Sequence, residues 1–164
     1  MHSPSPSPLL RLPTAPCWGL FTVTLLMSLL LLLMMGAGTM IGLVMRWILK
    51  QGGTDPGAMI FTPEMGFLLA MMVMGLALAW CFGVMARRAV GRNYASAGLL
   101  IGALYHAVLT WAILAQDTTS AVHIRQAGIS LSLPLALFTV AAGALSIHLL
   151  WKYRRPVQPP PLPY

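Results

Sequence analysis

The stretch that decides the fold is WGLFTVTLLMSLLLLLMMGAGTMIGLVM, from Trp18 to Met45, an apolar run without a charged residue. At about 1.5 Å per residue, a helix over this run is longer than the roughly 30 Å of hydrocarbon in a bilayer. A cleaved signal peptide is the rival interpretation, but its apolar region would span only about 7 to 15 residues. We therefore expect an uncleaved first membrane helix that tilts or protrudes.

The whole chain has the composition of a membrane protein. Of its 164 residues, 58% are hydrophobic and only 8% are charged, and the mean hydropathy is +0.79. So little polar surface cannot cover this much apolar surface in water, and the apolar residues fall in long blocks. The sequence predicts an all-α integral membrane protein.

Four apolar blocks predict an up-down bundle of four transmembrane helices within a domain at 17–153. The spans are expected at about 18–45, 63–86, 94–115 and 129–151. Thr62 and Glu64 are candidate caps of the second helix, because threonine accepts backbone hydrogen bonds and glutamate favours the positive end of the helix dipole. Proline between them is tolerated in a first turn.

Proline-rich segments flank this domain on both sides. Residues 1–16 are rich in serine and proline, and residues 154–164 are again proline-rich, so we expect two tails without regular helix. The C-terminal letters PPPLPY also resemble a proline-rich ligand of WW or SH3-type domains. The alternative is a disordered stop after the last helix.

The formal charge of +7 is better explained by membrane orientation than by nucleic-acid binding. The basic residues lie beside the apolar blocks and form no patch with interleaved aromatic residues. Four spans place both termini on one side, and the positive-inside rule predicts that this side is the cytoplasm of a bacterial inner membrane. The basic residues on that side are Arg11, Arg87, Arg88, Arg92, Lys152, Arg154 and Arg155, against Arg46, Lys50 and Arg125 on the other.

Small residues are candidates for helix packing, because helices in lipid associate through close contacts. The first span contains Gly38 and Gly42 in a Gly-x-x-x-Gly pair, and the third contains Gly98 and Gly102. Such pairs also occur by chance in glycine-rich spans. Residues of the other two spans with the same potential are Gly75, Gly83, Gly143 and Ser146.

One histidine, His106, is expected near the membrane midplane, beside Tyr105. It is either a functional group or a neutral histidine that is hydrogen-bonded between helices. His148 is expected near the inner end of the fourth span, so the two histidines do not match in depth as a haem pair would. Asp117 and His123 are two weak cation ligands in an expected loop, and Cys17 and Cys81 are expected to be free thiols.

Twelve methionines raise a copper hypothesis, since thioethers are soft ligands for Cu(I). Met71, Met72 and Met74 crowd the second span, with His106 as a further candidate ligand. The competing interpretation is that methionine fills gaps in a core. We find no Ser/His/Asp set, phosphate loop or paired carboxylate, so we expect neither an enzyme nor a cofactor.

Residues 36–75 resemble the start of subunit I of the haem-copper oxidases that use cytochrome c or quinol. In that family the first helix ends in small residues and Met-Arg, a short loop leads to Ser/Thr-Pro-Glu, and a second helix follows. The matching residues here are Met45, Arg46, the loop at 51–60, and Thr62-Pro63-Glu64. Where the family has a haem-ligating histidine, this chain reads Met71-Met72-Val73-Met74, so the resemblance implies a short relative without that haem site.

The expected function is therefore non-catalytic. Small-residue helix faces and the scarcity of buried charge favour an accessory, assembly or structural component of a larger membrane complex, with a respiratory oxidase as the suggested context. Its expected partners are the lipid bilayer and either other membrane subunits or a second copy of itself. The alternative is a small transporter or channel subunit for a soft metal ion such as copper.

Overall fold

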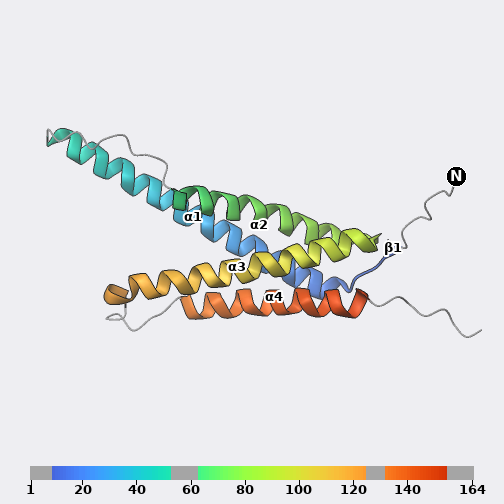
Figure 1. Cartoon of the computed structure of the whole chain (residues 1–164). Helices are drawn as coiled ribbons and strands as arrows, with labels where there is room; N and C mark the ends of the chain where they lie inside the picture. Colours follow the sequence, from blue (N-terminus) through green and yellow to red (C-terminus); the bar gives the residue numbers. More distant parts are fainter. Residues whose placement is uncertain (1–8, 53–62, 125–131, 155–164) are drawn as a thin grey trace, which may run out of the picture.

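The computed structural model describes residues 9–52, 63–124 and 132–154 (Figure 1). Within them the prediction of an all-helical bundle is confirmed. The described elements are β1 (Leu9–Leu10), α1 (Thr14–Gln51), α2 (Pro63–Arg87), β2 (Val90–Gly91), α3 (Arg92–Ile124) and α4 (Ser132–Arg154). Each helix contains a span that is long and apolar enough to cross a membrane: Thr14–Ile48, Gly66–Arg87, Arg92–Ala115 and Leu133–Tyr153.

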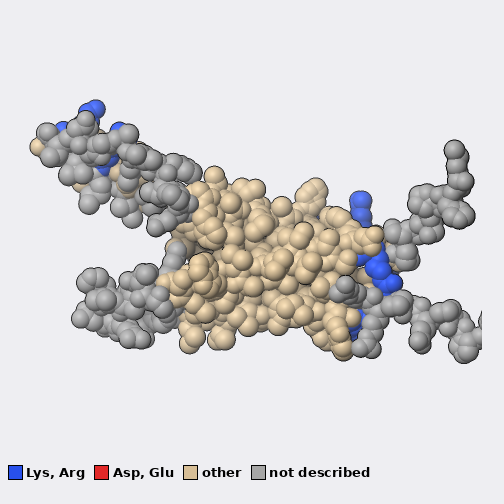
Figure 2. Space-filling model, in the orientation of Figure 1, with Lys and Arg blue, Asp and Glu red and all other residues tan. Residues whose placement is uncertain are grey.

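The four helices form two antiparallel pairs. Helix α1 packs mainly against α2, and α3 mainly against α4, while the two pairs share fewer contacts. The start of α1, the turn between α2 and α3, and the end of α4 lie at one end of the bundle (Figure 1). Lysines and arginines gather at this end and at the far tip of α1, and none covers the middle of the face that Figure 2 shows.

We call the end of the bundle at which α1 starts and α4 ends the basic end. It is defined by Arg11, Arg87, Arg88, Arg92 and Lys152. One contact there joins the two helices of a pair: Arg92 Nε donates a hydrogen bond to the Tyr153 carbonyl at 3.2 Å. The carbonyls of a final helical turn lack partners within the helix, so a cation at this position stabilises the end of α4. Arg92 therefore has a structural contact in addition to its predicted role in orientation. The Arg154 side chain and all of Arg155 lie outside the described part.

The N-terminal segment is more regular than the sequence predicted. Residues 9 and 10 lie in the expected tail, yet they pair antiparallel with β2 in the register Leu9↔Gly91 and Leu10↔Val90. Helix α1 begins at Thr14, with Pro13 as its N-cap, although irregular chain was expected as far as residue 16. Proline is compatible with this start, because the N–H groups of a first turn have no partner within the helix.

Two helices are longer than the spans predicted for them. Helix α1 runs to Gln51 and includes Arg46 and Lys50, and α3 runs to Ile124. The sequence limits were set by charged and polar residues, which end an apolar span without ending a helix. Helix α2 begins at Pro63, but Thr62 and the Glu64 side chain lie outside the described part, so their predicted capping role stays a prediction.

Glycines bring α2 and α3 together. A Cβ atom on Gly102 would lie 2.5 Å from Phe82 Cζ, and one on Gly98 would lie 2.9 Å from Cys81 Sγ. The α3 glycine pair therefore faces α2, where side chains of α2 occupy the space that the missing Cβ atoms leave. Of the other predicted pair, Gly42 is buried, whereas the surroundings of Gly38 lie outside what the structure describes.

Candidate functional site: a buried polar layer

A set of polar side chains crosses the interior of the bundle. Helix α1 contributes two hydroxyls, α3 contributes three polar side chains, and α4 contributes one hydroxyl. We call this set the polar layer: Thr24, Ser28, Tyr105, His106, Thr110 and Thr139. Thr24, Ser28, His106 and Thr139 are completely inaccessible, and Tyr105 is 1% exposed. Polar groups at this depth in lipid need partners within the protein.

His106 is at the centre of the layer, and both of its ring nitrogens are engaged. Nδ1 lies 2.7 Å from the Gly102 carbonyl oxygen, which can only accept, so Nδ1 carries a proton and donates. Nε2 lies 3.3 Å from Thr24 Oγ1 on α1. In the neutral ring Nε2 is an acceptor, and the threonine hydroxyl then donates to it. His106 therefore bridges α3 to α1 and has no unengaged lone pair for a metal.

A second hydrogen bond joins α3 to α4. Thr110 Oγ1 and Thr139 Oγ1 are 2.7 Å apart, and Thr110 also lies 2.7 Å from the carbonyl of His106. The hydroxyl of Thr139 lies 2.9 Å from the Ala136 carbonyl. These bonds and the contact of His106 with Thr24 join three of the four helices, so the polar layer cross-links the bundle.

Helix α2 contributes space to this layer instead of a polar group. Added to Gly75, a Cβ atom would collide with Ser28 Oγ and Tyr105 Oη, so only glycine admits both hydroxyls against α2. Ser28 donates to the Thr24 carbonyl at 2.7 Å. The Tyr105 hydroxyl is buried and has no hydrogen-bond partner among the described residues. Gly75 is therefore a specific requirement of the layer.

The polar layer has the chemistry of a structural cross-link. It contains no Asp, Glu, Lys or Arg, and its one histidine is fully engaged. Interhelical hydrogen bonds in membranes each contribute about 0.6 kcal/mol on average, and at most about 1.7 kcal/mol. Such bonds also determine which helix faces meet, because a different rotation would leave hydroxyls in hydrocarbon without partners.

The structure does not gather the candidate copper ligands on one surface. Met71 is buried in the core, Met72 is partly buried against it, and Met74 is 38% exposed. Among the described residues, no group of three or more His, Cys, Asp or Glu could hold a metal ion. The three thioethers face different surroundings, and His106 is engaged elsewhere.

The remaining candidates lie apart from the layer. Cys17 is buried and Cys81 is half-buried, and both are free, while His148 is exposed on α4. The side chains of Asp117 and His123 lie outside the described part.

Sequence reasoning missed Thr24, the hydroxyl partner of His106, and Ser28, which bonds to the Thr24 carbonyl. Thr24 and Ser28 are one helical turn apart in an otherwise apolar run, and residues at this spacing share a helix face. That spacing was the signal that could have identified them.

No family model, curated protein or solved structure matches this chain. The class of this protein is therefore assigned from its own sequence and structure. Four helices are long and apolar enough to span a bilayer, they pack as a bundle with an apolar exterior, and polar side chains such as His106 and Thr139 are buried inside. Large exposed hydrophobic residues on all four helices require lipid as their solvent. The chain is an integral, multi-pass membrane protein.

Proposed function

We propose that this protein is a non-catalytic subunit of a larger membrane complex, which it joins through the part of α1 that extends beyond the bundle. We call this part the α1 extension and define it as residues 34–51. The observation that carries the proposal is the length of α1, which exceeds what either the bilayer or the rest of the bundle can cover.

The excess length follows from the spans. The apolar span of α1 has 35 residues, whereas those of the other helices have 22, 24 and 21. At about 1.5 Å per residue, α1 is about 20 Å longer than its partner α2. Because the two helices pack along each other, α1 cannot gain extra tilt alone. Even its charge-free run, from Trp18 to Met45, is about 42 Å long at about 1.5 Å per residue. It would need a tilt near 45° to fit within about 30 Å of hydrocarbon, whereas membrane helices tilt between about 0° and 40°.

Several large apolar side chains of the α1 extension are exposed. Met40, Leu43 and Trp47 are each more than 60% exposed, and Figure 1 shows α1 continuing past the start of α2. A Cβ atom on Gly36 would meet nothing within 4 Å, so a neighbouring backbone has room to approach. Apolar side chains beyond the hydrocarbon core are stabilised by contact with another protein. This supports a partner subunit.

The orientation and context of the subunit are parts of the same proposal. The basic end, which carries the start of α1 and the end of α4, faces the cytoplasm of a bacterial inner membrane by the positive-inside rule. The α1 extension then lies toward the opposite face. The resemblance of residues 36–75 to an oxidase subunit makes a respiratory oxidase the first complex to test.

Purification in a mild detergent tests the proposal. The full chain should elute with stoichiometric amounts of other membrane subunits, identified by mass spectrometry. The double variant Leu43→Gln, Trp47→Gln should lose these subunits and stay helical. The matched control Leu100→Gln, Val140→Gln changes residues that are 51% and 52% exposed on α3 and α4, and it should retain them. An isolated homo-oligomer of the wild-type chain would contradict the proposal.

Metal transport is the competing function, and a second measurement separates the two. Replacement of Met71, Met72 and Met74 by leucine removes the thioethers and keeps apolar side chains. A subunit that acts by packing should leave the copper content of cells unchanged in this variant. A loss of copper accumulation would favour transport instead.

A further inference from the structure

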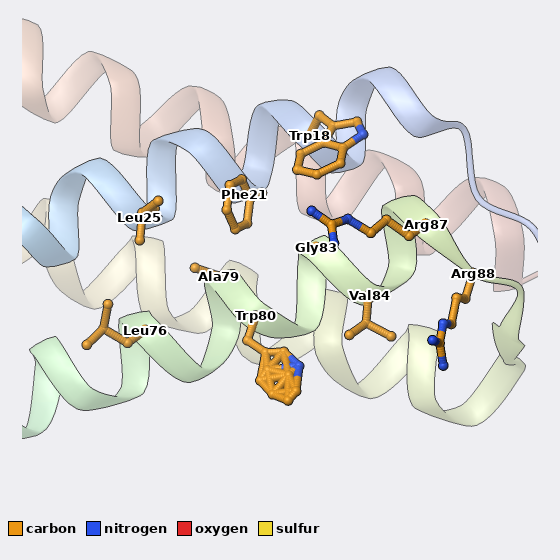
Figure 3. Close-up of a pocket in the computed structure, with 10 residues that line it drawn as sticks. All are labelled: Trp18, Phe21, Leu25, Leu76, Ala79, Trp80, Gly83, Val84, Arg87 and Arg88. Carbon is orange, nitrogen blue, oxygen red and sulfur yellow. The ribbon is translucent and has the colours of Figure 1, made fainter.

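A groove runs along the outside of the bundle between α1 and α2. Its volume is about 390 Å³, and it begins at the basic end beside Arg87 and Arg88. Its inner part is apolar and is lined by Leu25 from α1 and by Leu76 and Ala79 from α2 (Figure 3). One end of this groove is therefore cationic, and the other end is apolar.

Aromatic side chains shape the cationic end. Trp18 and Phe21 meet edge to face, with ring centroids 5.2 Å apart. The Arg87 guanidinium lies 5.3 Å from the centroid of the Trp18 ring, which orients it across the groove (Figure 3). A Cβ atom on Gly83 would lie 3.3 Å from Phe21 Cδ2, so the hollow beside Phe21 depends on the absence of a side chain there.

The positive charge at this end is not compensated within the described part of the chain. No Asp or Glu side chain belongs to that part, and both arginine side chains are exposed. A guanidinium stacked on an indole keeps its N–H donors, and it binds phosphate through two parallel hydrogen bonds. The complementary ligand is an anion that carries phosphate oxygens.

The length of the groove matches one leaflet of a bilayer. Arg87 and Leu76 are eleven residues apart on α2, which is about 16 Å along a helix. Half of the hydrocarbon core is about 15 Å deep. A molecule with its phosphate at the arginines would thus extend an acyl chain past Ala79 to Leu76, near the midplane.

We infer that this groove is a binding site for an anionic phospholipid of the leaflet at the basic end. Arg87 and Arg88 hold the headgroup phosphate, Trp18 orients Arg87, and one acyl chain lies along Leu25 and Leu76. Basic pockets between transmembrane helices recognise anionic lipid headgroups in this way. A helix of another protein in the same groove would leave the two guanidinium groups without counter-charges. The site is independent of the proposed partner on the α1 extension.

Lipid binding to the purified full chain in detergent tests the inference. Phosphatidylglycerol should remain bound in native mass spectrometry and should raise the melting temperature, whereas phosphatidylcholine should do neither to a comparable extent. The variant Arg87→Gln, Arg88→Gln should bind phosphatidylglycerol at least about tenfold more weakly. The control Arg46→Gln, Lys50→Gln removes two exposed cations at the other end of α1 and should bind it as the wild type does.

A second variant tests the apolar end of the groove and leaves both arginines in place. Leu76 is 39% exposed in the groove, and Leu76→Trp fills the acyl-chain path while both cations remain. This variant should also lose selective binding. Equal retention of the two lipids by the wild type would overturn the inference, and so would unchanged binding in either groove variant. Stabilisation by inorganic phosphate alone, equal to that by phosphatidylglycerol, would show a headgroup ion site and would overturn the lipid assignment.

Discussion

At the scale of single residues, His106 is buried and both of its ring nitrogens have hydrogen-bond partners. An imidazole within a membrane span is a candidate for metal or proton chemistry when a nitrogen is unengaged. Here Nδ1 donates to the Gly102 carbonyl and Nε2 is engaged by Thr24. The histidine therefore bridges α3 and α1. How much the Thr24 hydroxyl contributes to the stability of the bundle can be measured.

Replacement of Thr24 should measure that contribution. Thr24→Val preserves the shape of the side chain and removes the hydroxyl, which leaves Nε2 unpaired in the core. We expect the free energy of unfolding to fall by about 0.5–2 kcal/mol, measured by chemical unfolding in detergent micelles. The matched control is Thr22→Val, because the exposed Thr22 hydroxyl bonds only to the Trp18 carbonyl of its own helix. Equal effects of the two variants would show that the bond to His106 contributes nothing.

At the scale of helices, close approach at glycine decides how α2 meets α3. The sequence identified Gly98 and Gly102 as a pair on one helix face, but the face alone does not name the neighbour. The structure places Phe82 and Cys81 of α2 against them. Which helix fills such a gap depends on the complementary side chains of every other helix, so it is a property of the assembled bundle.

A single methyl group should therefore disturb this contact. Gly102→Ala places a Cβ atom at 2.5 Å from Phe82 Cζ, and the Phe82 ring is fully buried, so it has little room to move. Overpacking of this kind destabilises by about 1–3 kcal/mol. Gly36→Ala is the control, because its Cβ atom would meet nothing within 4 Å. Thermal unfolding of both variants in the same detergent should show a lower melting temperature for Gly102→Ala only. Similar melting temperatures would contradict the close contact of Gly102 with Phe82.

At the scale of the whole molecule, the charge distribution predicts one orientation. The basic end carries Arg11, Arg87, Arg88, Arg92 and Lys152, whereas the α1 extension carries Arg46 and Lys50. Positive residues near short loops are retained on the cytoplasmic side. A reporter that is active only in the cytoplasm should be active when it is fused after Arg154. A single cysteine at Lys50 in a cysteine-free background should react with an impermeant thiol reagent from outside. Labelling of that cysteine only after cell lysis would reverse the predicted orientation.

The sequence by itself determined the class of the protein and the number and order of its membrane helices, because hydrocarbon admits only long apolar segments with satisfied backbones. It also indicated His106 and the glycine pair of α3, since buried polar and small residues stand out in apolar spans. Helices α1 and α3 continue beyond the spans expected from the sequence, because the pattern measures where apolar residues stop, and a helix can continue past that point.

Only the tertiary structure decided which helices pair, which hydroxyl meets His106, and where a groove opens between α1 and α2. These contacts join residues far apart in the chain, such as Thr24 with His106 and Trp18 with Arg87. An apolar helix has no face that lipid disfavours, so its hydrophobicity contains little information about its rotation. The rotation of each helix is decided when small residues, hydroxyls and aromatic rings of all four helices are fitted together.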